Sequence, residues 1–598
     1  MLRMAEAGEL LDLGDCAGDP AAMKTWGRSR TIRAAVLRHL LVGEDRPVHA
    51  KGVRLRGVRI TGQLDLEAAT LSCPLRLADC YLSNPQAIIL DYATVSLLAL
   101  TGCHLAGLEG DSLVVTQRLD LTDSTLTGPL QLLGADITGS LTCSGAQLTV
   151  ANSDGNALAA ARMKVGGDVF LDKEFTAAGA VQLLGVDITG SLTCSGAQLT
   201  VANSDGNALA AEQIKVGGHV FLDKFLDRPF SAAGVVTLDG ADIAGQLNCG
   251  GAQLTATVAG GHARLVATGM KVGGDVFLGG GFTTAAVTLP AAHVGGSFQF
   301  SGRLTDPQGF DLTDSRIANA LVWAPETQVF GLVSLVDAAV GELYDFWRRR
   351  ANGYWPSAAE GRLLLNGFTY TRLVGPGDIG ADAATVEQRL AWIGSQPVPA
   401  TLAGRLAWIR DHPKRERKSF ATQPYEQLAR FYQMAGQDSE GRKVAIARRR
   451  DLRRYGNFTW YRRTGNWLLE KTIQYGYQTW RAVAGIAVLY LAVLVIFWYA
   501  QHRTGLIVPA QATTGIHPPP SAAQCTSHYP CFYPIGYAID TVIPLINVHQ
   551  ADYWRPNGSA PFGWFYVFVT WTGIVLGWAL ATLTVAGYTG LVRNTDAL

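Results

Sequence analysis

Nine cysteines are the residues of this 598-residue chain best suited to redox, nucleophilic or metal-binding chemistry. Cys143, Cys194 and Cys249 occupy the same place in successive repeats, with one cysteine per repeat, no CxxC and no adjacent histidine. A zinc or iron–sulfur centre needs several such ligands around one site. Because free cysteine also packs as a small apolar residue, we interpret these three as a stacked core column and predict no metal site.

Cys525 and Cys531 differ from the others because they lie close together, in the stretch CTSHYPC. The topology argued below places this stretch outside the cytosol. Disulfides persist in such oxidising surroundings, so a small disulfide between the two is our first interpretation.

Carboxylates and lysines also recur from repeat to repeat, and carboxylates on a β-helix face can serve polysaccharide cleavage or calcium binding. The repeated positions are Asp168, His219 and Asp275 in one column, Asp136, Asp187 and Asp242 in a second, and Lys164, Lys215 and Lys271 in Lys-Val-Gly-Gly runs. The acidic columns are spaced by whole repeats, so we interpret them as solvated faces. The glycine runs lack a phosphate-loop frame and are interpreted as turns or bulges. The sequence thus predicts no catalytic, cofactor-binding or metal-binding residue.

A long repeat positions these side chains. The passage from Leu132 returns almost unchanged from Leu183, a period of 51 residues. A shorter signature, first seen as ITGQLDL from Ile60, recurs with spacings of 11 and 22 residues, and we interpret each copy as a short strand with one buried face. About 22 residues suit one coil of a right-handed parallel β-helix. The 51-residue unit then comprises two coils and a loop, VANSDGNALAA.

The predicted fold is mainly β: a solenoid followed by a helical domain and two membrane helices. Residues 1–50 are predicted to form a helical cap, with an amphipathic helix over 25–42. The helix would bury Ile32, Val36, Leu37 and Leu40. The solenoid is predicted over 51–344, and a helical adaptor over 345–480 contains a tetratricopeptide-like hairpin that begins near Pro424.

Two apolar stretches, 481–500 and 562–592, are long enough to cross a bilayer. The first is preceded by a basic patch: Arg448, Arg449, Arg450, Arg453, Arg454, Arg462 and Arg463. By the positive-inside rule both termini, including the tail 593–598, are cytosolic, and the loop 501–561 is extracytoplasmic. The patch could bind anionic lipid headgroups or only determine topology, and the two interpretations are compatible.

Within that loop, an apolar segment from Tyr537 could lie on the membrane or dip into it. Asp540, His549 and Asp552 could be interface or ligand residues, or part of a structural loop near the headgroups. Span, pore helix and span is also how two-span cation channels are built. Such channels need a TVGYG-like filter, however, and this chain has IPLINVHQ instead.

The assembled motifs resemble a family of actinobacterial β-helix-repeat membrane proteins. They are GFTY from Gly367, PYEQLA from Pro424, RKVAIARRRDLRR, the ID-T-IP-L-I-HQ-YW loop and the terminal AGYTGLVR. Members are often labelled membrane-associated oxidoreductase, which the resemblance implies here by name only. The chain has no dinucleotide fingerprint, haem CxxCH or iron–sulfur spacing, so its residues predict no cofactor.

Charge and architecture together give the predicted function. Lys and Arg number 50 against 49 Asp and Glu, so no global field favours nucleic acid as a partner. We predict a scaffold or sensor, rather than an enzyme, in the bacterial cytoplasmic membrane. It would contact membrane lipid and use the solenoid to bind a protein partner or a second copy of itself. The alternatives are a channel-like oligomer gated by the solenoid and a membrane oxidoreductase.

Overall fold

A computed structural model describes residues 2–14, 20–43, 48–71, 73–255, 264–305, 309–327, 329, 331–346, 354–356, 362–374, 384–394, 421–455, 459–474, 478–511, 522 and 529–589. The chain divides into two compact units. The first comprises residues 1–408 and 423–431, and the second comprises 409–422 and 432–598. Each unit is described by itself.

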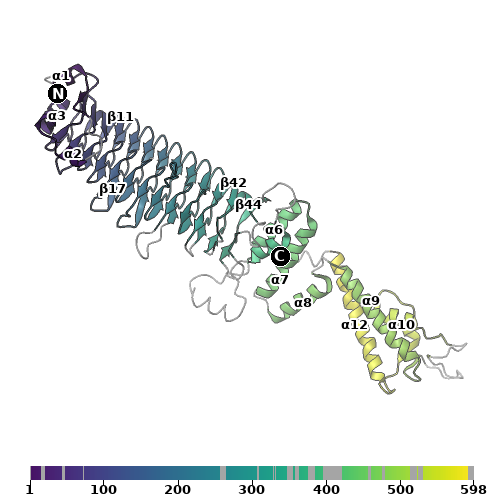
Figure 1. The fold of residues 1–598 in the computed structure, drawn as a ribbon. Coiled ribbons are helices and arrows are strands. Elements are labelled where there is room, and N and C mark those ends of the chain that lie inside the picture. Colours follow the sequence, from purple (N-terminus) through teal and green to yellow (C-terminus); the bar gives the residue numbers. More distant parts are fainter. Residues whose placement is uncertain are drawn as a thin grey trace. The chain divides into compact units, whose positions relative to one another are not determined.

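The first unit is a solenoid of stacked coils, and each regular coil contains four short strands (Figure 1). One coil passes through β14 (Asp136–Ile137), β15 (Leu141–Thr142), β16 (Gln147–Leu148) and β17 (Asn156–Ala159). The next strand, β18 (Lys164–Val165), then pairs in parallel with β14. Three parallel sheets result: sheet A holds the first two strands of each coil, sheet B the third and sheet C the fourth. The predicted parallel solenoid is confirmed, and its handedness stays a prediction.

The 51-residue period consists of two coils of unequal length. In sheet C, Leu130 pairs with Leu158, 28 positions on, and Leu158 pairs with Val181, 23 positions on. The longer coil holds its extra residues between sheets B and C, in the predicted loop from Val150. The interpretation of the unit as two coils and a loop is therefore correct.

In the regular coils each glycine signature is two strands with a bend, so the expectation of one short strand is wrong there. β14 and β15 are separated by Thr138, Gly139 and Ser140. A Cβ at Gly139 would overlap the carbonyl oxygen of Gln117, and one at Gly166 would overlap that of Thr138. Neither glycine has a positive φ. Glycine is required at these bends, and in the Lys-Val-Gly-Gly runs, because the neighbouring coil approaches closely.

The interior is aliphatic along most of the solenoid and aromatic near its C-terminal end. Phe300 and Phe310 are fully buried, and their ring centroids are 5.1 Å apart. The Trp323 ring lies 5.1 Å from that of Phe310 and stacks on Trp355 at 4.6 Å. Large aromatic rings fill the last coils and supply much of their apolar burial.

The N-terminal end differs from the predicted cap in two respects. β1 (Leu11–Asp12) and β2 (Thr31–Arg33) pair with the first coil, so the sheets begin before residue 51. The helix is shorter than predicted: α3 spans Ala34–Val42, with Ile32 in β2. It buries Leu37 and Leu40, as predicted, but Val36 is 42% exposed. The helix covers the end of the stack, where strand edges would otherwise be open.

The solenoid continues one coil beyond the predicted end at residue 344. β46 (Thr369–Val374) pairs with β44 (Ala339–Asp345). Two helices then adjoin this coil, α4 (Val386–Gly394) and α6 (Gln423–Met434). The Gln423 side-chain amide donates to the carbonyl of Phe368 at 3.0 Å.

A buried ion pair fixes α4 to the last coils. The two Arg389 Nη atoms each donate to one Asp345 carboxylate oxygen at 2.7 Å. Trp355 Nε1 donates to the same carboxylate at 3.0 Å. Asp345 is 0% exposed and Arg389 3%. Arg389 belongs to the first of the two RLAWI motifs, and the second, from Arg405, lies outside the described residues.

The second unit contains the helices α7 (Asp438–Tyr455), α8 (Trp460–Ile473), α9 (Trp480–Gln501) and α12 (Gly563–Tyr588). α9 and α12 are long and apolar enough to cross a membrane. They correspond to the two predicted spans. A short helix, α10 (Pro534–Val542), lies between them in sequence.

Candidate functional site

The cysteine column is buried, as predicted, but its members do not touch one another. Cys143 and Cys194 are separated by Leu171 of the intervening coil, because the repeat unit is two coils long. Burial raises the pKa of the Cys143, Cys194 and Cys249 thiols well above the usual range. Such thiols are poor nucleophiles, so this column contributes to packing.

The column that contains Asp168, His219 and Asp275 faces solvent, since His219 and Asp275 are exposed and Asp168 is partly buried, and it also joins neighbouring coils, which the sequence did not predict. Asp168 Oδ1 accepts a hydrogen bond from the backbone N–H of the next coil, at Ser191, at 2.8 Å. His219 Nδ1 accepts in the same way from Gln246 at 3.1 Å, and Asp275 Oδ1 accepts from the next coil at 2.6 Å. These side chains satisfy backbone donors at the glycine bend.

The second acidic column is part of a row of exposed charges on sheet A. Strand register places the lysines of the Lys-Val-Gly-Gly runs between its aspartates. We name this row the charged column; in stacking order it contains Asp136, Lys164, Asp187, Lys215, Asp242, Lys271, His293 and Arg316. The charge of its members alternates between negative and positive along six coils. The last two members are a histidine, which is titratable, and an arginine, which is basic.

All eight side chains of the charged column are exposed. Adjacent members stand one strand apart, about 4.8 Å. Among the residues that the structure describes, none of them forms an ion pair, and the one side-chain hydrogen bond runs between His293 Nδ1 and the carbonyl of Ala291 at 3.1 Å. Their charged ends are therefore available to a ligand.

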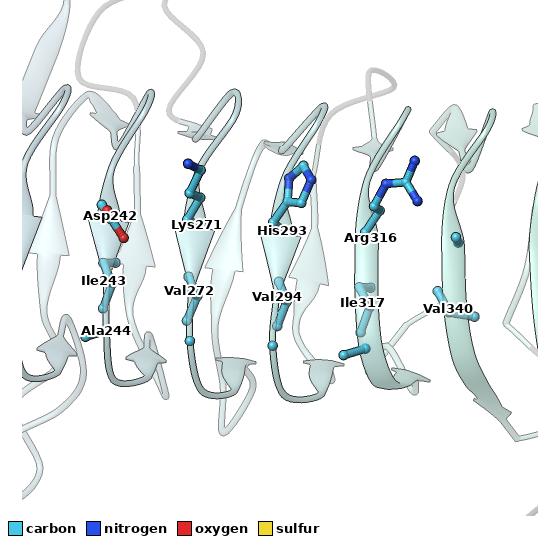
Figure 2. A pocket seen from close by; sticks show the side chains of 14 residues that line it. Asp242, Ile243, Ala244, Lys271, Val272, His293, Val294, Arg316, Ile317 and Val340 are labelled. Atoms are coloured by element: carbon cyan, nitrogen blue, oxygen red, sulfur yellow. The ribbon is translucent and has the colours of Figure 1, made fainter.

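The C-terminal part of the charged column borders a shallow open groove of about 530 Å³. Figure 2 shows Asp242, Lys271, His293 and Arg316 in one row on successive strands. The inward-facing members between them are buried aliphatic residues of the core. The groove therefore presents three nitrogen-bearing side chains beside one carboxylate, and it has no enclosed cavity that would hold a cofactor.

Small residues border the charged column along one of its two sides. Two positions after each charged residue lie Thr138, Gly166, Thr189, Gly217, Ala244, Gly273, Gly295 and Ala318, and all of them are exposed. The longer connections lie elsewhere: the loop from Val150 lies between sheets B and C, and residues 224–229 follow the second strand of their coil, between sheets A and B. No bulky insertion of the described coils therefore projects from this part of sheet A, and a flat surface can approach it.

Sequence reasoning identified the aspartates and the lysines separately but missed their alternation. It compared residues one whole repeat apart, such as Asp136 and Asp187. The signatures beginning at Ile137 and Val165 are one coil apart, and the residues just before them are Asp136 and Lys164. Alignment of those two signatures was the signal that would have revealed the column.

In the second unit, α10 packs against both apolar helices and reaches half-way along them. Phe497 of α9 and Tyr537 of α10 have ring centroids 4.6 Å apart. A Cβ at Gly573, near the middle of α12, would lie 2.8 Å from Thr541 Cγ2, and one at Gly577 would overlap the carbonyl oxygen of Val542. The two glycines, spaced as GxxxG, allow the end of α10 to lie directly against α12.

The segment after α10 turns back, and Asp540, one of the three candidate loop residues, holds it. Asp540 accepts from the backbone N–H groups of Val548 at 2.6 Å and Ala551 at 3.0 Å. His549 Nδ1 lies 2.8 Å from Asp552 Oδ2, and this hydrogen bond lowers the pKa of the exposed Asp552 carboxyl. Asp540 thus closes the loop, whereas His549 and Asp552 form a separate exposed pair. Asp540 therefore has a structural role in the loop, whereas a ligand or interface role for His549 and Asp552 stays a prediction.

The basic patch is divided between α7 and α8. Arg450 Nε lies 3.2 Å and Arg453 Nη1 2.6 Å from the Glu470 carboxylate, so these two arginines fasten α7 to α8. Arg462 and Arg463 are exposed. Arg448 and Arg449 are partly buried, and the side chain of Arg454 lies outside the described residues. Exposed apolar side chains, Tyr461, Trp467 and Leu468, accompany the arginines on α8.

Only one of the two cysteines of the predicted disulfide lies among the described residues. Cys531 is disulfide-bonded, and Cys525 lies outside the described residues. The pairing of these two cysteines stays a prediction. The loop around Cys531 is well packed: Trp554 is 1% exposed, and its Nε1 donates to the carbonyl of Pro530 at 3.0 Å.

Comparison with protein-family models, with curated proteins and with solved structures finds no match to the chain.

Proposed function

We propose that this protein is a membrane-anchored scaffold whose solenoid binds a partner through the charged column. The observation that carries the proposal is the column itself: eight exposed charged or titratable side chains on successive strands, free of ion pairs to the described residues. Complementary charged side chains across an interface contribute to specificity and to the association rate more than to affinity. Stacked repeats offer such extended surfaces without a single active site.

The anchoring role is supported by the second unit. α9 and α12 would cross the bacterial cytoplasmic membrane with both chain termini cytosolic, because the arginines of α7 and α8 precede α9. The exposed Arg462 and Arg463, next to exposed Trp467, form the mixture of basic and apolar groups that suits an interfacial helix. α8 would therefore rest on anionic headgroups at the cytosolic surface.

The binding role is tested by crosslinking and affinity capture of the full chain from native membranes. Lys271→Glu/Arg316→Glu reverses two charges of the groove, and Glu174→Lys reverses one exposed charge outside the charged column. We expect the groove variant to lose captured partners that the wild type and Glu174→Lys retain. Identical partners for all three proteins would contradict the proposal.

A second candidate, a channel-like oligomer, is favoured by the position of α10. A short helix that enters between two apolar helices, ends near their middle and is followed by a returning segment has the order and depth of a pore helix. Several copies would have to gather around the segment Ile543–Val548 to form a pore. Its exposed side chains include Leu545 and Ile546, so such a pore would be narrow and largely apolar.

Flux measurements on the purified full chain in liposomes test this candidate. Gly577→Val would displace the end of α10, because its side chain would collide with the Val542 carbonyl. Gly485→Val on α9 is the control, since a Cβ there meets nothing closer than 3.6 Å. A conducting protein should lose flux with Gly577→Val and keep it with Gly485→Val. Absence of flux in the wild type at any ionic gradient would remove this candidate.

A further inference from the structure

We infer that the partner of the charged column is a second copy of this chain, bound antiparallel through a two-fold axis between Asp187 and Lys215. The inference rests on the proposed function, because it names the occupant of the same face. The argument is charge complementarity. The first six members read acid, base, acid, base, acid, base. Reversed end to end, the same row reads base, acid, base, acid, base, acid.

An antiparallel pair of columns therefore places an opposite charge opposite every one of the six. Asp136 faces Lys271 of the second copy, Lys164 faces Asp242, and Asp187 faces Lys215, and each pair occurs twice. Such an arrangement is isologous, because the same patch contacts itself and the assembly closes at two copies. Both columns have the strand spacing of about 4.8 Å, so the register holds along the row.

The competing arrangements are less favourable. Two columns that run parallel and in register would place aspartate on aspartate and lysine on lysine, which is repulsive. A parallel pair shifted by one coil would match charges but would leave an unmatched end on each copy and would not close. In the antiparallel pair, His293 and Arg316 extend past Asp136 to the uncharged positions Val114 and Thr94 of the other copy, without repulsion.

The surface around the charged column permits this approach. On one side of the charged column the neighbouring exposed row consists of glycine, alanine and threonine, so no large side chain separates the two faces there. On the other side, Arg162 and Gln213 are exposed two positions before Lys164 and Lys215 and would lie at the edge of the contact. The six members span about 24 Å. Because the charges are exposed, the association should be salt-sensitive: the Debye length falls from about 10 Å at 0.1 M salt to about 3 Å at 1 M.

Charge exchange at the two-fold axis tests the inference with the full chain. Two differently tagged copies are co-expressed, extracted in mild detergent at 0.1 M salt and captured through one tag. Asp187→Lys alone, or Lys215→Asp alone, should reduce self-capture at least tenfold. The double variant Asp187→Lys/Lys215→Asp, and a mixture of the two single variants, should both restore it. Glu174→Lys is the control and should capture like the wild type.

The double variant also excludes the simplest other explanation. Alternating charges could only support neighbouring strands within one chain, since opposite cross-strand pairs are stabilising. In that case the double variant, which places a second basic side chain beside Lys164 and a second carboxylate beside Asp242, should melt as low as the single variants, because each of the three proteins has two like-charged neighbouring pairs. It should also fail to restore self-capture. Melting temperatures measured beside the capture experiment distinguish loss of folding from loss of association.

Zero-length carbodiimide crosslinking gives an independent measurement. Asp136 and Lys271 stand five strands apart in one chain, about 24 Å, so a direct bond between them must join two copies. We expect that crosslink at 0.1 M salt and its loss at 1 M. Only neighbour crosslinks such as Asp136–Lys164, together with failed self-capture, would overturn the dimer. If the dimer fails these tests but the Lys271→Glu/Arg316→Glu variant still loses a captured partner of another kind, the proposed binding role of the charged column remains supported. If that variant retains every partner, both the dimer and the proposed binding role are overturned.

Discussion

Removal of Arg389 should open the C-terminal cap of the solenoid, by which we mean α4 and the last coils with β44 and β46, without unfolding the central coils. Arg389→Leu leaves the Asp345 carboxylate, which is 0% exposed, with the Trp355 indole as its remaining donor among the contacts described above. Breaking a buried ion pair by removal of one partner costs about 3–5 kcal/mol. The cost should fall on the last coils, because each coil of a solenoid contacts only its neighbours.

Hydrogen exchange of the full chain measures this cost. At 1.4 kcal/mol per tenfold change, 3–5 kcal/mol corresponds to roughly 100- to 4,000-fold faster exchange of amides that exchange through cap opening. The amides of β44 and β46 report the opening of the last coils. The amides of β18, in the central coils, are the internal control. Exchange in β18 should not change.

The matched variant is Asp345→Asn/Arg389→Leu. Asparagine keeps an acceptor for the Trp355 indole and removes the uncompensated charge, so the double variant should recover most of the lost protection. The reasoning is refuted if Arg389→Leu accelerates exchange in β46 less than about fivefold, or if the double variant opens as readily as the single one. Either result would mean that the Asp345 carboxylate becomes hydrated or protonated inside the cap with little loss of stability.

Three further predictions concern the coils themselves. Burial, and then the charges of Asp91 and Asp111, raise the pKa of Glu109, so its ionised form destabilises the folded chain. Glu109→Gln should therefore raise the melting temperature at pH 7. The difference in melting temperature between the variant and the wild type should vanish below the unfolded pKa near 4.5, where Glu109 is protonated in both states. The buried cysteine column should resist iodoacetamide in the native protein and react fully in denaturant, as counted by mass spectrometry, because burial raises the pKa of its thiols. Asp275→Ala removes the acceptor of the Ser297 N–H. Because this hydrogen bond is exposed and water can replace the acceptor, the change should cost about 0.5–1.5 kcal/mol in denaturant unfolding, whereas Asp275→Asn should cost less.

Period and composition were sufficient to predict the stack. The passage repeats after 51 residues, and the glycine signature recurs with spacings of 11 and 22 residues, which predicts two coils in each 51-residue unit. The strand register confirms two coils per unit. Apolar length alone identified α9 and α12. The solenoid's ends were predicted less well, because β1, β2 and β46 join the sheets with sequences that lack the glycine signature. Their strand conformation follows from pairing with a neighbouring coil, which is tertiary information.

The charged column shows why an accurate fold did not by itself reveal the candidate site. Sequence similarity is strongest between residues 51 positions apart, and those residues carry the same charge. Within the duplicated passage, the spatial neighbours of the charged column on sheet A are instead 28 or 23 positions apart, and there the charges alternate. An aspartate compared only with its own copy resembles an ordinary solvated carboxylate. Once the coil replaces the repeat as the unit of comparison, Asp187 and Asp242 have lysines on both sides and Asp136 has one on its single charged side, and the row becomes the surface that we propose two copies of the chain share.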